Sequence, residues 1–147
     1  MSTQPEPIRV VAICIIRSGD EILVTDGFDH SRGKPFHRPL GGGVEPGETS
    51  FQAVEREIEE ELDQKVEDLR LLGTLENIFT YRGEAGHEIV FVYDGRFADT
   101  SVYDRRRQGL TGVEENGEPL AAVWRRLDSF DDYDRLVPEG LKEILDQ

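Results

Sequence analysis

The chain has 147 residues, which is enough for one compact domain and short for two. Its content, 37% hydrophobic and 33% charged, is typical of a folded globular protein, and no apolar run is long enough to span a membrane. A net charge of −14 repels nucleic acid and anionic membrane surfaces. We therefore expect a single cytoplasmic domain over residues 1–147 that binds neither.

The first predicted elements form a β-hairpin. Val10–Ile16 is a continuous apolar run rich in β-branched residues, and a Ser-Gly-Asp turn separates it from the second run, Ile22–Thr25. Cys14 lies in the first run and is the only cysteine, so an intrachain disulfide is excluded. We expect Cys14 to be a buried, unreactive thiol.

A loop and a helix follow the hairpin. Residues 26–35 lack periodicity and predict a loop, and Gly41-Gly42-Gly43 comes shortly after it as a stretch of open backbone. Apolar side chains then repeat every four residues from Ser50 to Leu62, which predicts a helix. Thr49 is the expected N-cap, and Gln52 completes a capping box.

The second half of the chain predicts more strands and a final helix. Leu69–Tyr81, Glu88–Phe97 and Pro119–Arg126 have the composition of strands, and Val137–Leu145 that of a helix. This order predicts an α/β fold in which a mixed β-sheet is covered by helices on its two faces.

Three glutamates share one face of the predicted helix. Glu57, Glu60 and Glu61 stand at positions i, i+3 and i+4, where like charges repel one another. Either the face is solvated, which is the common case, or a cation lies against it. Carboxylate oxygens suit Mg²⁺ or Mn²⁺ better than zinc. The glycines before the helix favour the cation, because bare backbone can approach both a metal and a phosphate.

The segment from Gly42 to Gln64 resembles the signature of the Nudix hydrolases, G-x5-E-x7-R-E-U-x-E-E-x-G-U, where U is a bulky aliphatic residue. Seven of its nine specified positions agree. The matching residues are Gly42, Glu48, Arg56, Glu57, Ile58, Glu60 and Glu61. The resemblance implies an α/β/α sandwich and the hydrolysis of a diphosphate linkage in a nucleoside diphosphate linked to another moiety.

The resemblance also implies roles for these residues. Glu57, Glu60 and Glu61 correspond to metal ligands for Mg²⁺, which Mn²⁺ can replace, and Gly41 would add its backbone carbonyl. Arg56 and Glu48 correspond to an orienting ion pair beside Gly42. Glu57 and Glu60 are both candidates for the general base.

The sequence departs from the signature at its end. Asp63 and Gln64 replace a glycine and an aliphatic residue, and Leu40 stands where proline is frequent. Glycine after a last helical turn usually adopts a left-handed C-cap, which aspartate reaches at some cost. The departure bears on how the helix ends rather than on the chemistry.

Candidate substrate contacts lie outside the signature. Arg38 and His37 precede the glycines and could bind phosphate, although a solvated loop is an equal alternative. Tyr81 favours the diadenosine polyphosphate hydrolases, which tend to carry a tyrosine beyond the signature where ADP-ribose hydrolases carry proline. A strand residue with no role is the alternative for Tyr81.

A further metal-binding carboxylate is expected just before the strand that starts near Pro119. The candidates are Glu114, Glu115 and Glu118, and we favour Glu118 because the rigid sheet can aim it. Solvated loop acids are the alternative.

Two other functions compete with hydrolysis. The chain could be a silent Nudix-fold sensor that binds a nucleotide, but such proteins usually lose the signature carboxylates, and this sequence keeps them. It could also be an acidic structural protein with an accidental match. The expected partner is a small nucleotide-like molecule, and the sequence is compatible with a homodimer.

Overall fold

The computed structural model of the chain describes residues 7–104, 108–114 and 116–146. Its regular elements, in chain order, are β1 (Arg9–Ser18), β2 (Glu21–Asp29), β3 (Lys34–Arg38), β4 (Leu40–Gly43), α1 (Ser50–Leu62), β5 (Val66–Tyr81), β6 (Glu84–Phe97), α2 (Ser101–Asp104), β7 (Leu110–Val113), β8 (Pro119–Arg126), the 3₁₀ turn η2 (Leu127–Ser129), β9 (Arg135–Leu136) and α3 (Leu141–Leu145).

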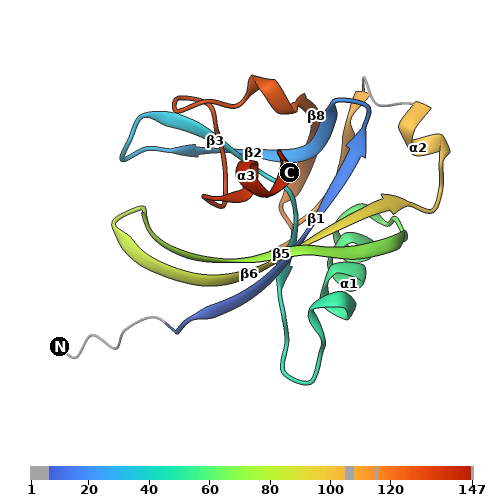
Figure 1. Cartoon of the computed structure of the whole chain (residues 1–147), viewed down its shortest axis with the longest axis horizontal. Coiled ribbons are helices and arrows are strands. Elements are labelled where there is room, and N and C mark those ends of the chain that lie inside the picture. Colours follow the sequence, from blue (N-terminus) through green and yellow to red (C-terminus); the bar gives the residue numbers. More distant parts are fainter. Residues whose placement is uncertain (1–6, 105–107, 115, 147) are drawn as a thin grey trace.

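Strand β1 is the centre of the fold (Figure 1). Over residues 9–16 it pairs in parallel with β6, and over residues 11–14 it pairs antiparallel with β4 on its other edge. Its last two residues turn to β2, which continues through β3 and β8. Within the described residues, β5 adds to β6, β9 to β3 and β7 to β8, which completes one mixed nine-stranded sheet.

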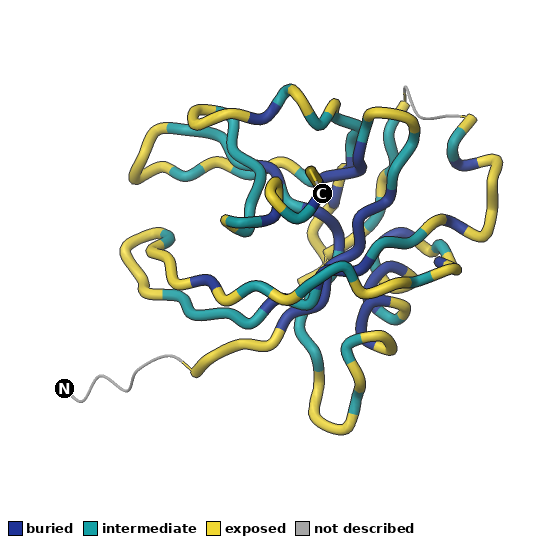
Figure 2. The backbone as a smooth tube through the Cα atoms, in the orientation of Figure 1, coloured by how far each residue is buried: buried dark blue, intermediate teal, exposed yellow. Residues whose placement is uncertain are grey.

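The side chains of β1 alternate between two hydrophobic cores. Ala12, Cys14 and Ile16 pack with the apolar face of α1, and Val11, Ile13 and Ile15 pack with Leu141 and Leu145 of α3. Figure 2 shows the resulting band of buried backbone along β1. The helices thus cover two faces of a mixed sheet, which confirms the predicted α/β class.

Cys14 is fully buried between β1 and α1, as predicted. Burial raises the pKa of its thiol above the ordinary value. A thiol held protonated in an apolar core is a packing residue, not a nucleophile.

Several elements differ from the sequence prediction. Residues 26–35 do not form a loop throughout, because β2 continues to Asp29 and β3 begins at Lys34. Gly41–Gly43 is not a loop but belongs to strand β4, where the β1 ladder fixes the glycines in extended pairing. The loop predicted between the two long strands shortens to a tight turn between β5 and β6. The last helix begins at Leu141 rather than near Pro138, because residues 135–136 pair with β3 as β9.

None of the helices in the described part of the chain is both long and apolar enough to cross a membrane.

Candidate functional site

Helix α1 is held at both ends by local contacts. The Thr49 side chain accepts a hydrogen bond from the Gln52 amide, and the Gln52 side chain accepts one from the Thr49 amide, so the predicted capping box is present. At the other end Asp63 adopts the left-handed conformation (φ 54°, ψ 41°), and its amide donates to the Glu59 carbonyl. Asp63 therefore takes the C-cap geometry that glycine usually supplies.

Glu57 is the buried carboxylate of the site. Only 1% of its surface is exposed, and its carboxylate accepts a hydrogen bond of 3.0 Å from Arg56. On its other side lies Gly42 of β4, where an added β-carbon would come within 2.4 Å of the Glu57 carboxyl carbon. Helix and strand can approach this closely only because position 42 has no side chain.

Glu61 lies one helical turn beyond Glu57 on the same face. Burial, a hydrogen bond with Glu57 and the charge of Glu57 raise the pKa of Glu61 to about 9. The raised pKa means that the two adjacent carboxylates disfavour a second negative charge. A bound cation would remove that cost, because it would interact favourably with both.

Glu60 is placed differently from its neighbours. Its side chain is 54% exposed and lies 3.3 Å from the Arg56 guanidinium. It could reach a metal only by leaving Arg56, which such an exposed side chain does at little cost. The described residues contain no cluster of three or more Asp, Glu, His or Cys side chains already gathered to hold a metal.

Arg56 joins the helix to the segment that leads into it. It donates two hydrogen bonds to Glu48, at 2.7 and 2.9 Å, and one of 3.0 Å to the Gly43 carbonyl. The bond from Arg56 and one from the Glu45 amide lower the pKa of Glu48 to about 2. Arg56 and Glu48 thus fix the chain between β4 and α1, as expected of an orienting ion pair.

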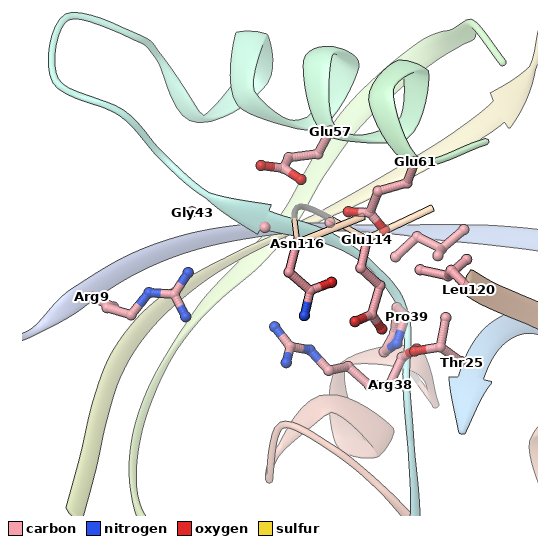
Figure 3. A pocket seen from close by; sticks show the side chains of 13 residues that line it. Arg9, Thr25, Arg38, Pro39, Gly43, Glu57, Glu61, Glu114, Asn116 and Leu120 are labelled. Carbon is pink, nitrogen blue, oxygen red and sulfur yellow. The ribbon is translucent and has the colours of Figure 1, made fainter. Parts of the chain in front are cut away.

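A cavity of about 340 Å³ opens beside these carboxylates (Figure 3). It is lined by Arg9, Thr25, Arg38, Pro39, Leu40, Gly41, Gly42, Gly43, Glu57, Glu61, Glu114, Asn116 and Leu120. Figure 3 shows Glu57 and Glu61 reaching from α1 on one side, and Arg9 and Arg38 extending toward Asn116 on the other. The Glu114 carboxylate lies between them, near Arg38, so the cavity combines carboxylates with guanidinium groups, as a metal and a phosphate would require.

Several sequence-predicted residues do not line this cavity. His37 is buried instead, with Nδ1 2.6 Å from Asp26 and Nε2 in contact with Asp134. Two carboxylates hold its ring, which links β3 to β2 and to the segment before β9. Tyr81 is the last residue of β5, and its ring packs edge-on against that of Phe36, with 5.8 Å between the ring centroids.

Glu118, the carboxylate expected to join the metal site from outside the signature, does not line the cavity either. Glu118 is exposed and is not among the residues that line the cavity, whereas Glu114 is. The Glu114 amide donates to the Glu118 carbonyl across the turn between β7 and β8. Glu115 lies outside the described residues.

Sequence reasoning missed Arg9 and Asn116. Arg9 is far from the signature in the chain, and only the pairing of β1 with β4 brings it near the glycines. Asn116 precedes Gly117, and this pair indicates only a turn. The local sequence around these two residues carries no signal that would have identified them.

Comparison with known proteins agrees with this geometry. A family model for the NUDIX domain matches residues 6–145. The chain is 46% and 32% identical, over 133 residues, to NAD-capped RNA hydrolases NudC of two Klebsiella pneumoniae strains. Each match covers 88% of this chain but only 44% of the relative, so the chain spans less than half the length of these proteins.

A solved structure of a Nudix hydrolase resembles this chain over nearly its whole length. The MutT NUDIX hydrolase from Burkholderia pseudomallei is 27% identical, with a TM-score of 0.65 over 97% of this chain and 98% of that one. Fold, signature and cavity thus define a hydrolase in which a glutamate-rich helix faces a glycine strand. The chain belongs to the Nudix hydrolase family.

Proposed function

We propose that the protein hydrolyses a diphosphate linkage in a nucleoside diphosphate joined to another moiety, with Mg²⁺ as its metal and Mn²⁺ as a substitute. The observation that carries this proposal is the cavity, in which the buried Glu57 and the half-buried Glu61 face two arginines across the glycine strand. The family membership and the NudC relatives support the same reaction class.

The carboxylate side of the cavity has the donors that Mg²⁺ prefers. Glu57 and Glu61 would hold the metal together with Glu60 once it has turned from Arg56, and Gly41 would supply its backbone carbonyl. The missing side chain at Gly42 leaves the space that the Glu57 carboxylate occupies beside the glycine strand. When bound, Mg²⁺ would neutralise phosphate oxygens and acidify the attacking water.

The remaining steps belong to the chain's own side chains. Arg56 and Glu48 orient Glu57, because the Arg56 guanidinium is bonded to both carboxylates. A carboxylate must also take the proton of the attacking water. The candidates are Glu57, which lines the cavity, and Glu60, which lies on the same helix but outside the lining. Arg38 would bind the substrate phosphate.

The substrate is proposed as a small nucleotide. The NudC relatives are named for NAD-capped RNA, but the net charge of −14 opposes long RNA over distance. The repulsion grows with the number of phosphates near an acidic surface, so a molecule with two phosphates is repelled less than a long RNA. We place this activity in the cytoplasm.

The test is a hydrolysis screen with Mg²⁺ across nucleoside triphosphates, nucleotide sugars, dinucleoside polyphosphates, NAD and NAD-capped RNA, with EDTA as the matched blank. We expect turnover of at least one small diphosphate compound, and none with EDTA. Binding of such compounds without turnover of any of them would instead identify a sensor module.

A further inference from the structure

Two arginines face the cavity from the side opposite the glutamates. Arg9 is the first residue of β1 and Arg38 the last of β3, and both line the cavity with Asn116 near them (Figure 3). The elements that carry the arginines belong to different parts of the sheet, so their meeting is a product of the fold.

Neither arginine is committed to a strong ion pair. Among the described residues, the ion-pair partner of Arg9 is Glu88, whose carboxylate lies 3.8 Å away, and the Arg9 side chain is 56% exposed. For Arg38, no carboxylate among the described residues lies within salt-bridge distance. Such loose pairing contributes little to stability. By contrast, Arg56 and Arg125 meet their carboxylates at 2.7 and 2.5 Å.

Strand β4 separates the two sides of the cavity. Successive residues of a strand face opposite sides of the sheet, so Gly42 faces Glu57 and Gly43 faces Arg9. An added β-carbon at Gly43 would lie 3.1 Å from the Arg9 guanidinium. Among the described strands β4 pairs only with β1, so its other edge can meet a ligand that contacts both sides.

We propose that Arg9 is a specificity-determining residue that binds one phosphate of the substrate while the neighbouring phosphate lies on the glutamate side of β4. The guanidinium offers paired donors that match phosphate oxygens, and it supplies positive charge where the protein as a whole repels anions. Arg9 therefore selects compounds with two adjacent phosphates over those with one. The inference rests on the proposed function for the identity of the site.

Binding of inorganic pyrophosphate in the presence of Mg²⁺ tests this directly by calorimetry. We expect Arg9→Gln to weaken pyrophosphate binding about tenfold, because a charge-assisted hydrogen bond is lost. Binding of inorganic phosphate should change much less. Arg9→Lys should recover part of the loss, and in turnover Arg9→Gln should raise KM with kcat nearly unchanged.

Arg70→Gln is the matched control, because Arg70 is 75% exposed, lies 3.9 Å from Asp94 and does not line the cavity. It removes the same charge and should leave pyrophosphate binding unchanged. Equal losses in the two variants would mean that only the general surface charge matters, and would overturn the role of Arg9.

Gly43→Ala adds an independent test, since the new methyl group would lie 3.1 Å from the Arg9 guanidinium and shift it slightly from the β4 backbone without removing its charge. We expect weaker pyrophosphate binding in the wild-type background and no further loss in Arg9→Gln. Additive losses would contradict the inference.

The binding measurement also separates the two proposals. If the wild type is inactive but its pyrophosphate binding still depends on Arg9, the proposed hydrolysis is refuted and the phosphate site at Arg9 is kept.

Discussion

A β-carbon at Gly42 would lie 2.4 Å from the carboxyl carbon of Glu57. No ordinary contact between carbon atoms is so short, so one of the two groups would have to move. Because Glu57 is held by Arg56 and its side chain is buried between α1 and β4, its carboxylate has little room to move. The glycine that opens the signature is thus required by the packing of strand against helix.

The first prediction follows from this contact. Gly42→Ala should lower turnover by orders of magnitude and raise the Mg²⁺ concentration needed for half-maximal activity, because the displaced Glu57 carboxylate would no longer meet the metal. Turnover measured against Mg²⁺ concentration checks it.

Gly73→Ala is the control for that variant. Its new β-carbon would meet only the flexible end of Ile144, at 3.2 Å, on a strand that does not line the cavity. Gly73→Ala should keep the Mg²⁺ dependence of the wild type. A normal Mg²⁺ dependence in Gly42→Ala would show that Glu57 is not a ligand.

The second prediction concerns Glu60 and Glu61. Glutamine at either position should lower turnover by orders of magnitude with the fold intact, because each change removes a ligand charge. Glu59→Gln is the control, since Glu59 is on the exposed side of the same helix. Near wild-type turnover of either variant at saturating Mg²⁺ would remove that residue from the site.

Glu61→Gln should also stabilise the metal-free protein, most strongly at high pH. The folded state raises the pKa of Glu61 from 4.5 to about 9, so this group favours folding fully below pH 4.5 and loses that contribution as the pH rises through 9. Glutamine stays neutral and can donate to Glu57. Urea unfolding in EDTA at pH 5 and pH 8 should show a larger gain for Glu61→Gln at pH 8; the reverse order would contradict the sign.

Sequence reasoning reached the helix and its neighbours in the chain but not the contacts that cross the sheet. The cap at Thr49 and the glutamate spacing depend on residues close in sequence, so local chemistry predicts them. The sequence does not predict the glycine strand, because glycine is depleted in strands and only its ladder with β1 identifies it. Arg9 was missed for the same reason.

His37 shows a second limit. A histidine beside an arginine and close to a glycine run indicates phosphate binding when it is read locally. The structure instead surrounds His37 with Asp26, Asp134 and Arg125, which lie on β2, on the segment before β9 and on β8. Which of two neighbouring residues faces the cavity depends on the pleat of β3, and that phase is set by pairing with β2.

The third prediction uses the left-handed Asp63. Asp63→Gly should stabilise the protein by about 0.5–1 kcal/mol, because glycine enters that region without steric cost. Activity should remain unchanged. Asp68→Gly is the comparison, since Asp68 is also left-handed (φ 56°) but forms an ion pair of 2.6 Å with Arg96. Chemical denaturation of both variants decides; a destabilised Asp63→Gly would show that the Asp63 side chain contributes more than its strain costs.

The fourth prediction concerns acid stability. The pKa of Glu48 is lowered to about 2 by its bonds with Arg56 and the Glu45 amide, so this carboxylate favours folding above pH 4.5 and loses that contribution as the pH falls through 2. Glu48→Gln should therefore lose less stability than the wild type between pH 4.5 and 2. Glu55→Gln, an exposed position on α1, should follow the wild-type curve. Parallel curves for all three proteins would exclude Glu48 from the acid transition.

The fifth prediction concerns the carboxylate that joins the site from outside the signature. Glu114 lines the cavity and its charge acts on Glu61, whereas Glu118 is outside the lining. Glycine at position 112 brings the two segments together, because an added β-carbon there would lie 1.7 Å from the Glu61 carbonyl oxygen. Strand β7 thus packs directly against the end of α1 and holds Glu114 near the metal-binding face.

We therefore expect Glu114→Gln to be impaired in turnover and to need more Mg²⁺, with Glu118→Gln close to the wild type in both. The two variants remove the same charge from the same turn, so general electrostatics affects them alike and cancels in the comparison. Titrating each with Mg²⁺ and fitting kcat separately from the half-saturating concentration distinguishes a metal ligand from a base. A ligand changes the Mg²⁺ dependence, while a base lowers kcat at saturating metal. Stronger impairment of Glu118→Gln would mean that the turn rearranges when substrate binds, and that the strand before Pro119 aims Glu118 after all.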